Sequence, residues 1–548
     1  MLGLMQQGAL LTSRLLDHAA RRHRAARIVT QGRDGSTSTL TYPEMAARTA
    51  RLAHAFAARG VQRGERIATL AWNDHRHLEL YYGVTGLGAV CHTVNPRLFP
   101  DQIAFILNHA ADTHLVLDPA FLPVLAGIAD RLEPTLKTLV LLEPPADPVP
   151  PAIADRFEMI DYENLLAGQD DRLDWPEFDE NTAAFLCYTS GTTGDPKGVL
   201  SSHRSVTLHA LAANQPDAFG LGAQDIVMPV VPMFHVNAWG LPFIAPMSGA
   251  SLVLPGARLD GASLFRLIED HGVTFAAGVP TIWLGLLNHL RDTGARFTRP
   301  PRLLIGGSAC PMPIIETFER EYGVRIDHAW GMTETSPIGL YNTPKPEQAG
   351  WTDEQRLQLK RKQGRSPFGI DLRIVDAGGQ DLPADGEAFG EIMVRGPWVA
   401  RAYFGHDADP AFTADGWFRT GDVATMDGSG YVEIVDRAKD VIKSGGEWIS
   451  SIALENIAIG HPKVREAAVV GARHPKWEER PVLIVVAADG TAPTKAEILD
   501  WFDGKVAKWW RPDDVVFVDQ LPHTATGKLL KTELRKRYRD HLGEDPRS

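Results

Sequence analysis

The 548-residue sequence contains one segment, Tyr188–Gly198, whose residue types suit the binding of a polyphosphate. It reads Tyr-Thr-Ser-Gly-Thr-Thr-Gly-Asp-Pro-Lys-Gly and follows an apolar run of strand length, Ala183–Cys187. Its glycines allow a turn with exposed backbone N–H groups, its hydroxyls add donors, and Lys197 adds a positive charge. The spacing differs from a Walker A loop, because Gly194 is followed by Asp195 and not by lysine. We therefore predict a phosphate-binding loop, against the alternative of a Ser/Thr/Gly surface loop.

The elements that must position this loop alternate between strand-length apolar runs and segments of helical period. Pro43–Arg59 has the spacing of an amphipathic helix with a proline in its first turn, and Gly261–His271 and Ile282–Thr293 are further predicted helices. The predicted short strands are Arg66–Ala71, Leu115–Asp118, Thr138–Leu142, Val227–Val231, Ser251–Leu254, Phe275–Ala277 and Leu303–Ile305. This alternation indicates an α/β fold with largely parallel sheets.

The pattern changes after about Arg365, where strands are joined by turn-rich loops. Asp371–Val375, Gly390–Arg395 and Tyr431–Asp436 indicate a small meander or barrel. A separate small α+β domain begins near Asp440. Its predicted helices are Ile452–Gly460, Lys495–Lys505 and Leu529–His541, and its predicted strands are Glu466–Val470, Val482–Ala487 and Asp514–Val518. We predict a large N-terminal domain, residues 1–438, of layered α/β subdomains plus a small barrel, and a small C-terminal α+β domain, residues 439–548.

Composition limits the possible partners and location. A hydrophobic fraction of 44% and a charged fraction of 23% are typical of a soluble globular protein. The net charge of -12 makes the chain a poor non-specific binder of nucleic acid. We see no signal peptide, and no run approaches the roughly 18–20 apolar residues that span a bilayer. Cys91, Cys187 and Cys310 lack metal-ligand spacing and cannot all pair, so a cytoplasmic location is the simplest expectation.

Tyr188–Gly198 resembles the phosphate loop of the adenylate-forming superfamily, which comprises acyl-CoA synthetases, firefly luciferase and peptide-synthetase adenylation domains. Six later segments resemble further motifs of the superfamily in the same order: Gly306–Cys310, His328–Thr335, Phe418–Asp422, Asp436–Asp440, Lys443–Trp448 and Thr524–Lys528. The resemblance implies an enzyme that uses ATP and Mg²⁺ to activate a small-molecule carboxylic acid as an acyl-adenylate. The acyl group then passes to coenzyme A.

The resemblance also assigns roles to single residues. Lys528, His235 and Glu334 are expected to be catalytic, and Thr189 and Glu334 to hold Mg²⁺. Lys528 would bridge the substrate carboxylate and the α-phosphate, and Asp422 would hold the ribose hydroxyls. The expected nucleotide and cofactor contacts are Thr189, Ser190, Gly191, Thr192, Thr193, Gly194, Lys197, Val236, Gly307, Ser308, His328, Ala329, Trp330, Gly331, Thr333, Asp422, Arg437, Lys439, Lys443 and Trp448.

The acyl group is expected beside Pro232–Trp239, and the expected substrate contacts are His235, Trp239, Gly307 and Trp330. This segment has no carboxylate to hold an ammonium, which argues against an amino-acid substrate. Together with Cys91–Leu98 and Lys443–Ser451, it resembles a bacterial subgroup of ligases. That subgroup acts on medium- and long-chain fatty acids and on methylmercaptopropionate, and the sequence does not separate these acids.

The superfamily further implies a mobile C-terminal domain that rotates about a residue corresponding to Lys439, and a homodimer. His523 departs from the arginine or lysine of many relatives and is expected to alter the packing of the lysine loop. One alternative is an enzyme that loads a separate carrier protein; only 20 residues follow Lys528, so we expect no fused carrier domain. A non-catalytic AMP-binding regulator is disfavoured, because Lys528, Glu334 and Asp422 are all present. Nothing in the sequence requires a luciferase-like oxygenase.

Overall fold

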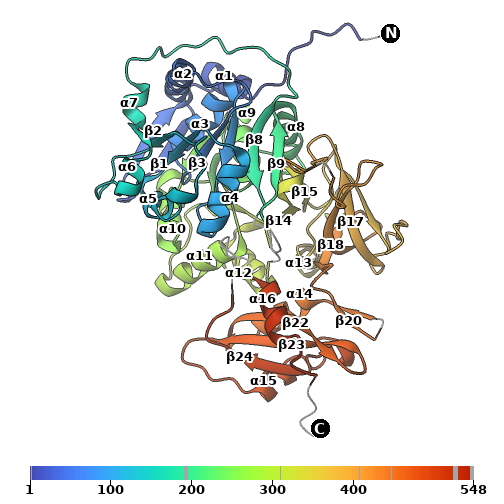
Figure 1. Ribbon diagram of the computed structural model, residues 1–548. Coiled ribbons are helices and arrows are strands. Elements are labelled where there is room, and N and C mark those ends of the chain that lie inside the picture. The colour runs from blue at the N-terminus through green and yellow to red at the C-terminus, as the bar shows by residue number, and fades with distance from the viewer. Residues whose placement is uncertain are drawn as a thin grey trace.

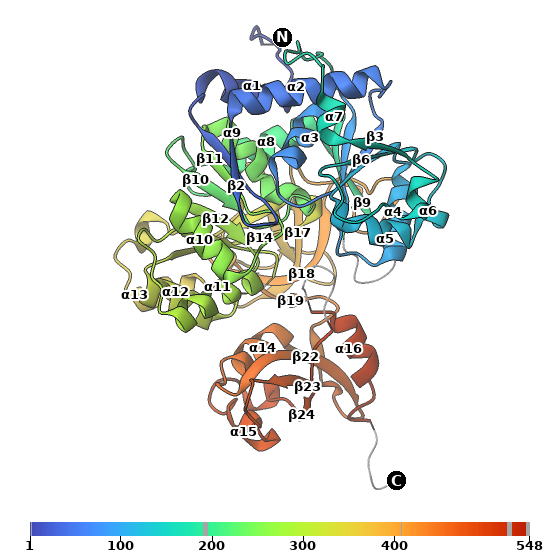
Figure 2. The ribbon, with the colours of Figure 1, turned by 90° about the vertical axis from the view of Figure 1, so that its left-hand side faces the viewer.

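The computed structural model describes residues 1, 3–189, 195–308, 310–406, 408–445, 447–522 and 529–543, except the side chain of Glu447. Two large sheets with helices on their faces make up most of the molecule, and a smaller antiparallel sheet lies beside them (Figure 1). The C-terminal part, coloured orange to red, forms a body below the rest of the chain in both ribbon views (Figures 1 and 2).

The first large sheet has seven strands in the order β7-β6-β5-β3-β4-β8-β9, and only the β8–β9 pair is antiparallel. The strands are β3 Arg66–Leu70, β4 Val90–Thr93, β5 His114–Leu117, β6 Thr138–Leu141, β7 Glu158–Asp161, β8 Ala183–Tyr188 and β9 Gly198–Ser202. The three strands predicted in its first half are confirmed to within one residue at each end.

The second large sheet has eight strands in the order β15-β14-β13-β12-β10-β11-β1-β2, with antiparallel strands only at its two edges. The strands are β1 Arg27–Gln31, β2 Thr37–Thr41, β10 Ile226–Pro229, β11 Ser251–Leu254, β12 Phe275–Gly278, β13 Arg302–Ile305, β14 Arg325–Gly331 and β15 Ile338–Tyr341. The predicted strands of this sheet are confirmed, with ends that differ by at most two residues.

Helices form three layers around the two large sheets, so this region has an α/β/α/β/α arrangement. One apolar cluster packs the central helices α1, α2, α3, α8 and α9 between both sheets, while α4 and α5 cover the outer face of the first sheet and α10, α11 and α12 that of the second. The helices are α1 Ser13–Arg22, α2 Tyr42–Ala58, α3 His75–Gly86, α4 Pro100–Ala110, α5 Leu122–Ala126, α6 Pro151–Ala154, α7 Tyr162–Leu166, α8 His203–Ala213, α9 Leu241–Ser248, α10 Gly261–His271, α11 Pro280–Thr293, α12 Met312–Tyr322 and α13 Asp353–Leu359. The predicted layered α/β fold is thereby confirmed.

Helix α2 shows why the sequence signal for its start was reliable. Thr41 caps the helix by accepting from the Glu44 N–H, and the Glu44 carboxylate accepts from the Thr41 N–H at 2.7 Å. Pro43 lies in the first turn, where its missing N–H needs no partner. The apolar face then buries Met45 and Phe56 completely in the central layer.

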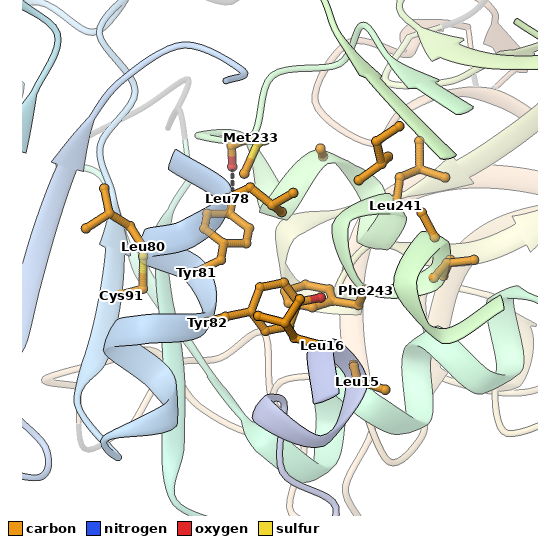
Figure 3. Close-up of a cluster of buried hydrophobic side chains, with 14 of the residues drawn as sticks. Leu15, Leu16, Leu78, Leu80, Tyr81, Tyr82, Cys91, Met233, Leu241 and Phe243 are labelled. Atoms are coloured by element: carbon orange, nitrogen blue, oxygen red, sulfur yellow. Dashed lines mark hydrogen bonds between the residues drawn. The ribbon is translucent and has the colours of Figure 1, made fainter. Parts of the chain in front are cut away.

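Two tyrosines of α3 bind the segment after β10 and the start of α9. The Tyr81 hydroxyl donates to the Met233 carbonyl oxygen, and the Tyr82 hydroxyl donates to the Pro242 carbonyl oxygen at 2.6 Å. Figure 3 shows both rings beside Phe243 in the buried cluster, with the bond from Tyr81 to Met233 drawn as a dashed line. These bonds hold the chain within the predicted acyl segment, at Met233, and just after it, at Pro242.

The third sheet has four strands, β16 Asp371–Val375, β17 Phe389–Arg395, β18 Phe418–Met426 and β19 Val432–Arg437. Each pairs antiparallel with the next in chain order. The sequence allowed a meander or a barrel, and the ladders of the described residues form the meander, because no ladder joins β16 to β19. Its apolar face packs against Trp330 and Leu340 of the second sheet.

The C-terminal body contains five strands: β20 Ile442–Ser444, β21 Glu447–Ile449, β22 Val464–His474, β23 Glu478–Ala487 and β24 Asp514–Phe517. Helices α14 Ser451–Ile459 and α15 Lys495–Asp500 cover one face, and α16 Lys531–Tyr538 covers the other. Helix α15 ends before the predicted Lys505, because the Trp501 indole N–H donates to the Ile457 carbonyl oxygen and Gly504 turns with φ 74°. The predicted domain boundary at residue 438 falls between β19 and β20.

Within the described ranges, none of the helices combines the length and the apolar character that crossing a bilayer requires.

Candidate active site

The predicted motif segments follow the C-terminal ends of parallel strands in both large sheets. The phosphate loop follows β8, Pro232–Trp239 follows β10, and Gly306–Cys310 follows β13. Buried Asn73, just after β3, brings the two sheet edges together. Its amide donates to the carbonyl oxygens of Pro229 (2.8 Å) and Val231 (3.0 Å), and its oxygen accepts from the Met233 N–H at 2.7 Å. Ligands of α/β sheets bind at this edge, so the sheets define one candidate site.

The base of the phosphate loop is closed by hydrogen bonds between its two ends. The Thr189 N–H donates to the Lys197 carbonyl oxygen at 2.9 Å, and the Lys197 N–H donates to the Thr189 hydroxyl at 3.3 Å. These bonds extend the pairing of β8 with β9. The loop residues Ser190, Gly191, Thr192, Thr193 and Gly194 lie outside the described residues.

The Lys197 side chain lies between two groups that the sequence did not single out. Its Nζ is 2.5 Å from Asp409 Oδ2 and 4.7 Å from the centroid of the Tyr403 ring. The same tyrosine donates its hydroxyl to Glu334 Oε1 at 2.7 Å. Tyr403 and Asp409 are far from their partners, Glu334 and Lys197, in the sequence, so no spaced motif contains either pair.

Glu334 is 5% exposed in the short 3₁₀ helix Thr333–Thr335. Burial raises the pKa of its carboxyl, and the Tyr403 hydrogen bond partly opposes that shift. A buried carboxylate with one phenol donor is suited to a cation, because the cation compensates the lost solvation.

Glu334 and the Thr189 hydroxyl are the predicted Mg²⁺ ligands, and both offer the oxygen donors that this ion prefers. No cluster of three or more His, Cys, Asp or Glu side chains is present among the residues that the structure describes. Mg²⁺ needs no such cluster, since it is commonly held by one or two carboxylates together with water and substrate phosphates. Two protein oxygens match the number that Mg²⁺ commonly takes from a protein when nucleotide supplies the remaining oxygens.

Asp422 on β18 is 3% exposed and is held by two donors. The Trp330 indole N–H lies 2.8 Å from Oδ2, and Arg437 Nε lies 2.7 Å from Oδ1. The Trp330 ring packs with Ile370 and Phe418 in the core of the third sheet. The Trp330 indole therefore contacts this core and the carboxylate predicted to bind ribose, and its predicted contact with the acyl group stays a prediction.

The acyl segment contains an unusual left-handed turn over Val236–Gly240. Four consecutive residues that are not glycine have positive φ, with values of 37°, 56°, 47° and 57° from Val236 to Trp239. Such backbone is strained for L-residues and persists only where its surroundings hold it. Asn237 supplies that hold, since its Oδ1 accepts from the Tyr81 hydroxyl at 3.3 Å and from Cys187 Sγ at 3.5 Å.

Two predicted substrate residues, Trp239 and Gly307, are brought together. A Cβ atom at Gly306 would lie 3.1 Å from the Trp239 indole, and one at Gly307 would lie 3.7 Å from it. The indole therefore lies on the glycine turn after β13, where a larger residue would displace it. His235 is half-buried immediately before the left-handed turn.

Other predicted nucleotide contacts surround β14. The His328 ring is buried, burial lowers its pKa to about 4, and its Nδ1 lies 3.1 Å from the Lys360 carbonyl oxygen. Ala329 is buried, Gly331 and Thr333 are half-buried, and Ser308 is exposed. Thr333 and Val236 line a small cavity of about 10 Å³ behind the left-handed turn.

The remaining predicted contacts lie where the C-terminal body begins. Arg535 of α16 donates to the Lys439 carbonyl oxygen at 2.8 Å. Lys443 and Trp448 face each other across the β20–β21 hairpin, and the Trp448 ring lies 5.3 Å from that of Phe389 on β17. The predicted catalytic Lys528 lies outside the described residues.

This fold and site define an enzyme of the AMP-binding class. The family model described as AMP-binding enzyme matches residues 16–404, and the model of the AMP-binding enzyme C-terminal domain matches residues 453–528. The chain therefore belongs to the family of AMP-binding enzymes, and the predicted superfamily is confirmed.

The relatives that share about half of their residues with the chain are acid–CoA ligases. It is 52% identical to the 3-methylmercaptopropionyl-CoA ligase of Ruegeria lacuscaerulensis over 99% of the chain and 100% of that protein. It is 49% identical to the medium-chain-fatty-acid–CoA ligase of Ectopseudomonas oleovorans, over 99% and 98% of the two chains. The o-succinylbenzoate coenzyme A synthetase of Bacillus subtilis, solved with ATP and a magnesium ion, is 26% identical with a TM-score of 0.77, over 95% and 99% of the chains.

Proposed function

We propose that this protein is an AMP-forming acid–CoA ligase. The carboxylate of its substrate would attack the α-phosphate of ATP and release pyrophosphate, and the thiol of coenzyme A would then displace AMP from the acyl-adenylate. The observation that carries this proposal is a set of contacts in a chain that matches CoA ligases along its whole length. Tyr403 contacts both Lys197 and Glu334, and Asp422 accepts from Trp330 on β14, the strand just before Glu334.

The proposed substrate is 3-methylmercaptopropionate or a medium- or long-chain fatty acid. The segment Met233–Trp239 offers an apolar lining, and its described side chains include no carboxylate for an amino-acid ammonium. Relatives at similar identity act on both kinds of acid, so the family likeness alone does not choose between them. All of these acids have an unbranched, uncharged tail.

We assign residue roles in the first half-reaction from the negative charge of the reacting groups. Attack on the α-phosphate brings two anions together and leaves pyrophosphate. Lys197 would neutralise the departing phosphates, Asp422 would orient the ribose, and Lys528 would bridge the carboxylate and the α-phosphate. Mg²⁺ held by Glu334 and Thr189, when bound, would neutralise phosphate charge.

The second half-reaction requires the C-terminal domain, proposed as residues 439–548, to change its position about Lys439. We place the hinge between β19 and β20, where Asp436 on one side accepts from the N–H and hydroxyl of Ser451 on the other, both at 2.6 Å. The chain between these bonded residues holds Lys443 and Trp448, which we assign to the thioester-forming geometry.

A separate carrier protein as acyl acceptor is the second candidate. Coenzyme A is favoured because the full-length relatives are named as CoA ligases. We also propose a homodimer and a cytoplasmic location. The three cysteines are free and buried, which suits a reducing compartment, and light scattering after size exclusion would test the dimer.

The half-reactions test the assigned chemistry. With ATP, Mg²⁺ and 3-methylmercaptopropionate or octanoate, the protein should release pyrophosphate before coenzyme A is added. Lys528→Ala should reduce this step by at least about 100-fold and leave thioester formation from supplied acyl-adenylate largely intact. An equal loss in both half-reactions would remove Lys528 from its assigned role.

A further inference from the structure

The Lys197 ammonium is paired with a carboxylate that the adenylation chemistry does not use. Asp409 meets it from a position 212 residues later in the chain, and the Asp409 side chain is only 10% exposed. Its other oxygen accepts from the Ala411 N–H at 2.9 Å. Although burial opposes ionisation, hydrogen bonds from Lys197 and Ala411 hold the pKa of Asp409 below its ordinary value. The partner of Lys197 is thus a fixed anion.

The chain around Asp409 is anchored to the phosphate-binding elements. The Phe404 N–H donates to the carbonyl oxygen of Gly198 at 2.8 Å, directly after Lys197. Tyr403 places its ring beneath the Lys197 ammonium and its hydroxyl on Glu334. Among the residues that the structure describes, the ammonium contacts an aromatic face, which can stay in place, and a carboxylate, which an arriving anion can replace.

A phosphate oxygen and the Asp409 carboxylate compete for the same ammonium. Both are anions, and like charges that share one partner at close range destabilise each other. Pyrophosphate must break its contact with Lys197 before it leaves the site. A carboxylate already held beside the lysine supplies the replacement partner without moving the backbone.

We infer that Asp409 is a positioning residue. It re-forms its ion pair with Lys197 in place of pyrophosphate and so promotes release of this product. This inference rests on the proposed function, in which Lys197 binds the departing phosphates. It assigns Asp409 an effect opposite to that of a residue that merely holds Lys197 in place for ATP.

The test is the affinity of the full-length protein for pyrophosphate, measured by titration calorimetry with Mg²⁺ present. Asp409→Asn should bind pyrophosphate about three- to tenfold more tightly than the native protein, and product inhibition by pyrophosphate should strengthen by the same factor. In Lys197→Met, adding Asp409→Asn should leave the pyrophosphate affinity unchanged, because the contested ammonium is absent. The Asp427→Asn variant is the control, since it breaks a lysine–aspartate pair of similar length, 2.6 Å to Lys362, away from the phosphate loop.

Weaker or unchanged pyrophosphate binding by Asp409→Asn would overturn the inference, as would a tighter affinity that persists in the Lys197→Met background. Asp409→Glu, which keeps the charge, should stay within about twofold of the native affinity. If the native protein forms no acyl-adenylate, the proposed function fails. If it forms acyl-adenylate but Asp409→Asn releases pyrophosphate normally, only this inference fails.

Discussion

The indole nitrogen of Trp330 lies 2.8 Å from one carboxylate oxygen of Asp422, and Arg437 occupies the other oxygen. Trp330 lies on β14 with its ring in the core of the third sheet, and Arg437 lies on β19, beside Asp422 in the β18–β19 ladder. The carboxylate proposed to hold the ribose is thus oriented by one donor from the second sheet and one from the third.

Trp330→Phe should keep the ring in the core and remove its donor. We expect the KM for ATP to rise about tenfold, since losing one hydrogen bond to a charged group costs about 1.5 kcal/mol. Trp398→Phe is the control, because that indole donates to the Ile338 carbonyl oxygen at 3.3 Å and makes no contact with Asp422. The same rise in both variants would show that the effect is general loss of core stability.

Tyr81→Phe and Tyr82→Phe form a matched pair on one helix. Each leaves a buried carbonyl oxygen without its donor, so each should lower the free energy of unfolding by about 1–3 kcal/mol. Only Tyr81 also donates to Asn237 of the left-handed turn. The kcat/KM for the acid should therefore fall in Tyr81→Phe alone, and equal kinetic losses would contradict a role for this turn.

Glu334→Gln should stabilise the protein without ligands while reducing adenylation by at least about 100-fold. The Glu334 pKa is raised by burial, so its carboxyl adds stability below the unfolded pKa near 4.5, and this contribution is lost as pH rises through the folded pKa. Thermal melts without ATP and Mg²⁺ should show a higher Tm for the variant at pH 7 and convergence toward pH 4. A lower Tm at pH 7 would mean that ionised Glu334 is well compensated without a metal.

Trp239→Ala should enlarge the space on the glycine turn after β13. The ratio of kcat/KM for a long acid to that for a short acid should increase several-fold, since the indole fills volume beside Gly306 and Gly307. Octanoate, laurate and 3-methylmercaptopropionate give a suitable series. An unchanged ratio, with normal Tm, would place the acyl tail elsewhere.

Much of the fold was predictable because its strands and helices carry local signals. The Thr41–Glu44 cap and the apolar runs of the parallel sheets depend on residues that are close together in the sequence. The strands of the third sheet were predictable, but their arrangement was not. Strand pairing decides between a meander and a barrel, and no short segment encodes that choice.

Candidate site residues can be named from the sequence where they form a spaced motif, and not where distant segments meet. Lys197, Glu334 and Asp422 lie in such motifs, whereas Tyr403, Asp409 and Asn73 act through contacts with remote parts of the chain. Trp330 also lies in such a motif, but the direction of its ring depends on the packing of the third sheet, which no local pattern encodes. The left-handed turn at Val236–Gly240 has no sequence signal before its final glycine.

The central claim is tested most directly by measuring AMP and acyl-CoA together. Purified protein is supplied with ATP, Mg²⁺, coenzyme A and, one at a time, 3-methylmercaptopropionate and straight-chain acids of increasing length. We expect at least one acid to give AMP and its CoA thioester in equal amounts, with neither product when acid is omitted. The absence of acid-dependent AMP across the series would contradict the account, and AMP without thioester would contradict coenzyme A as the acceptor.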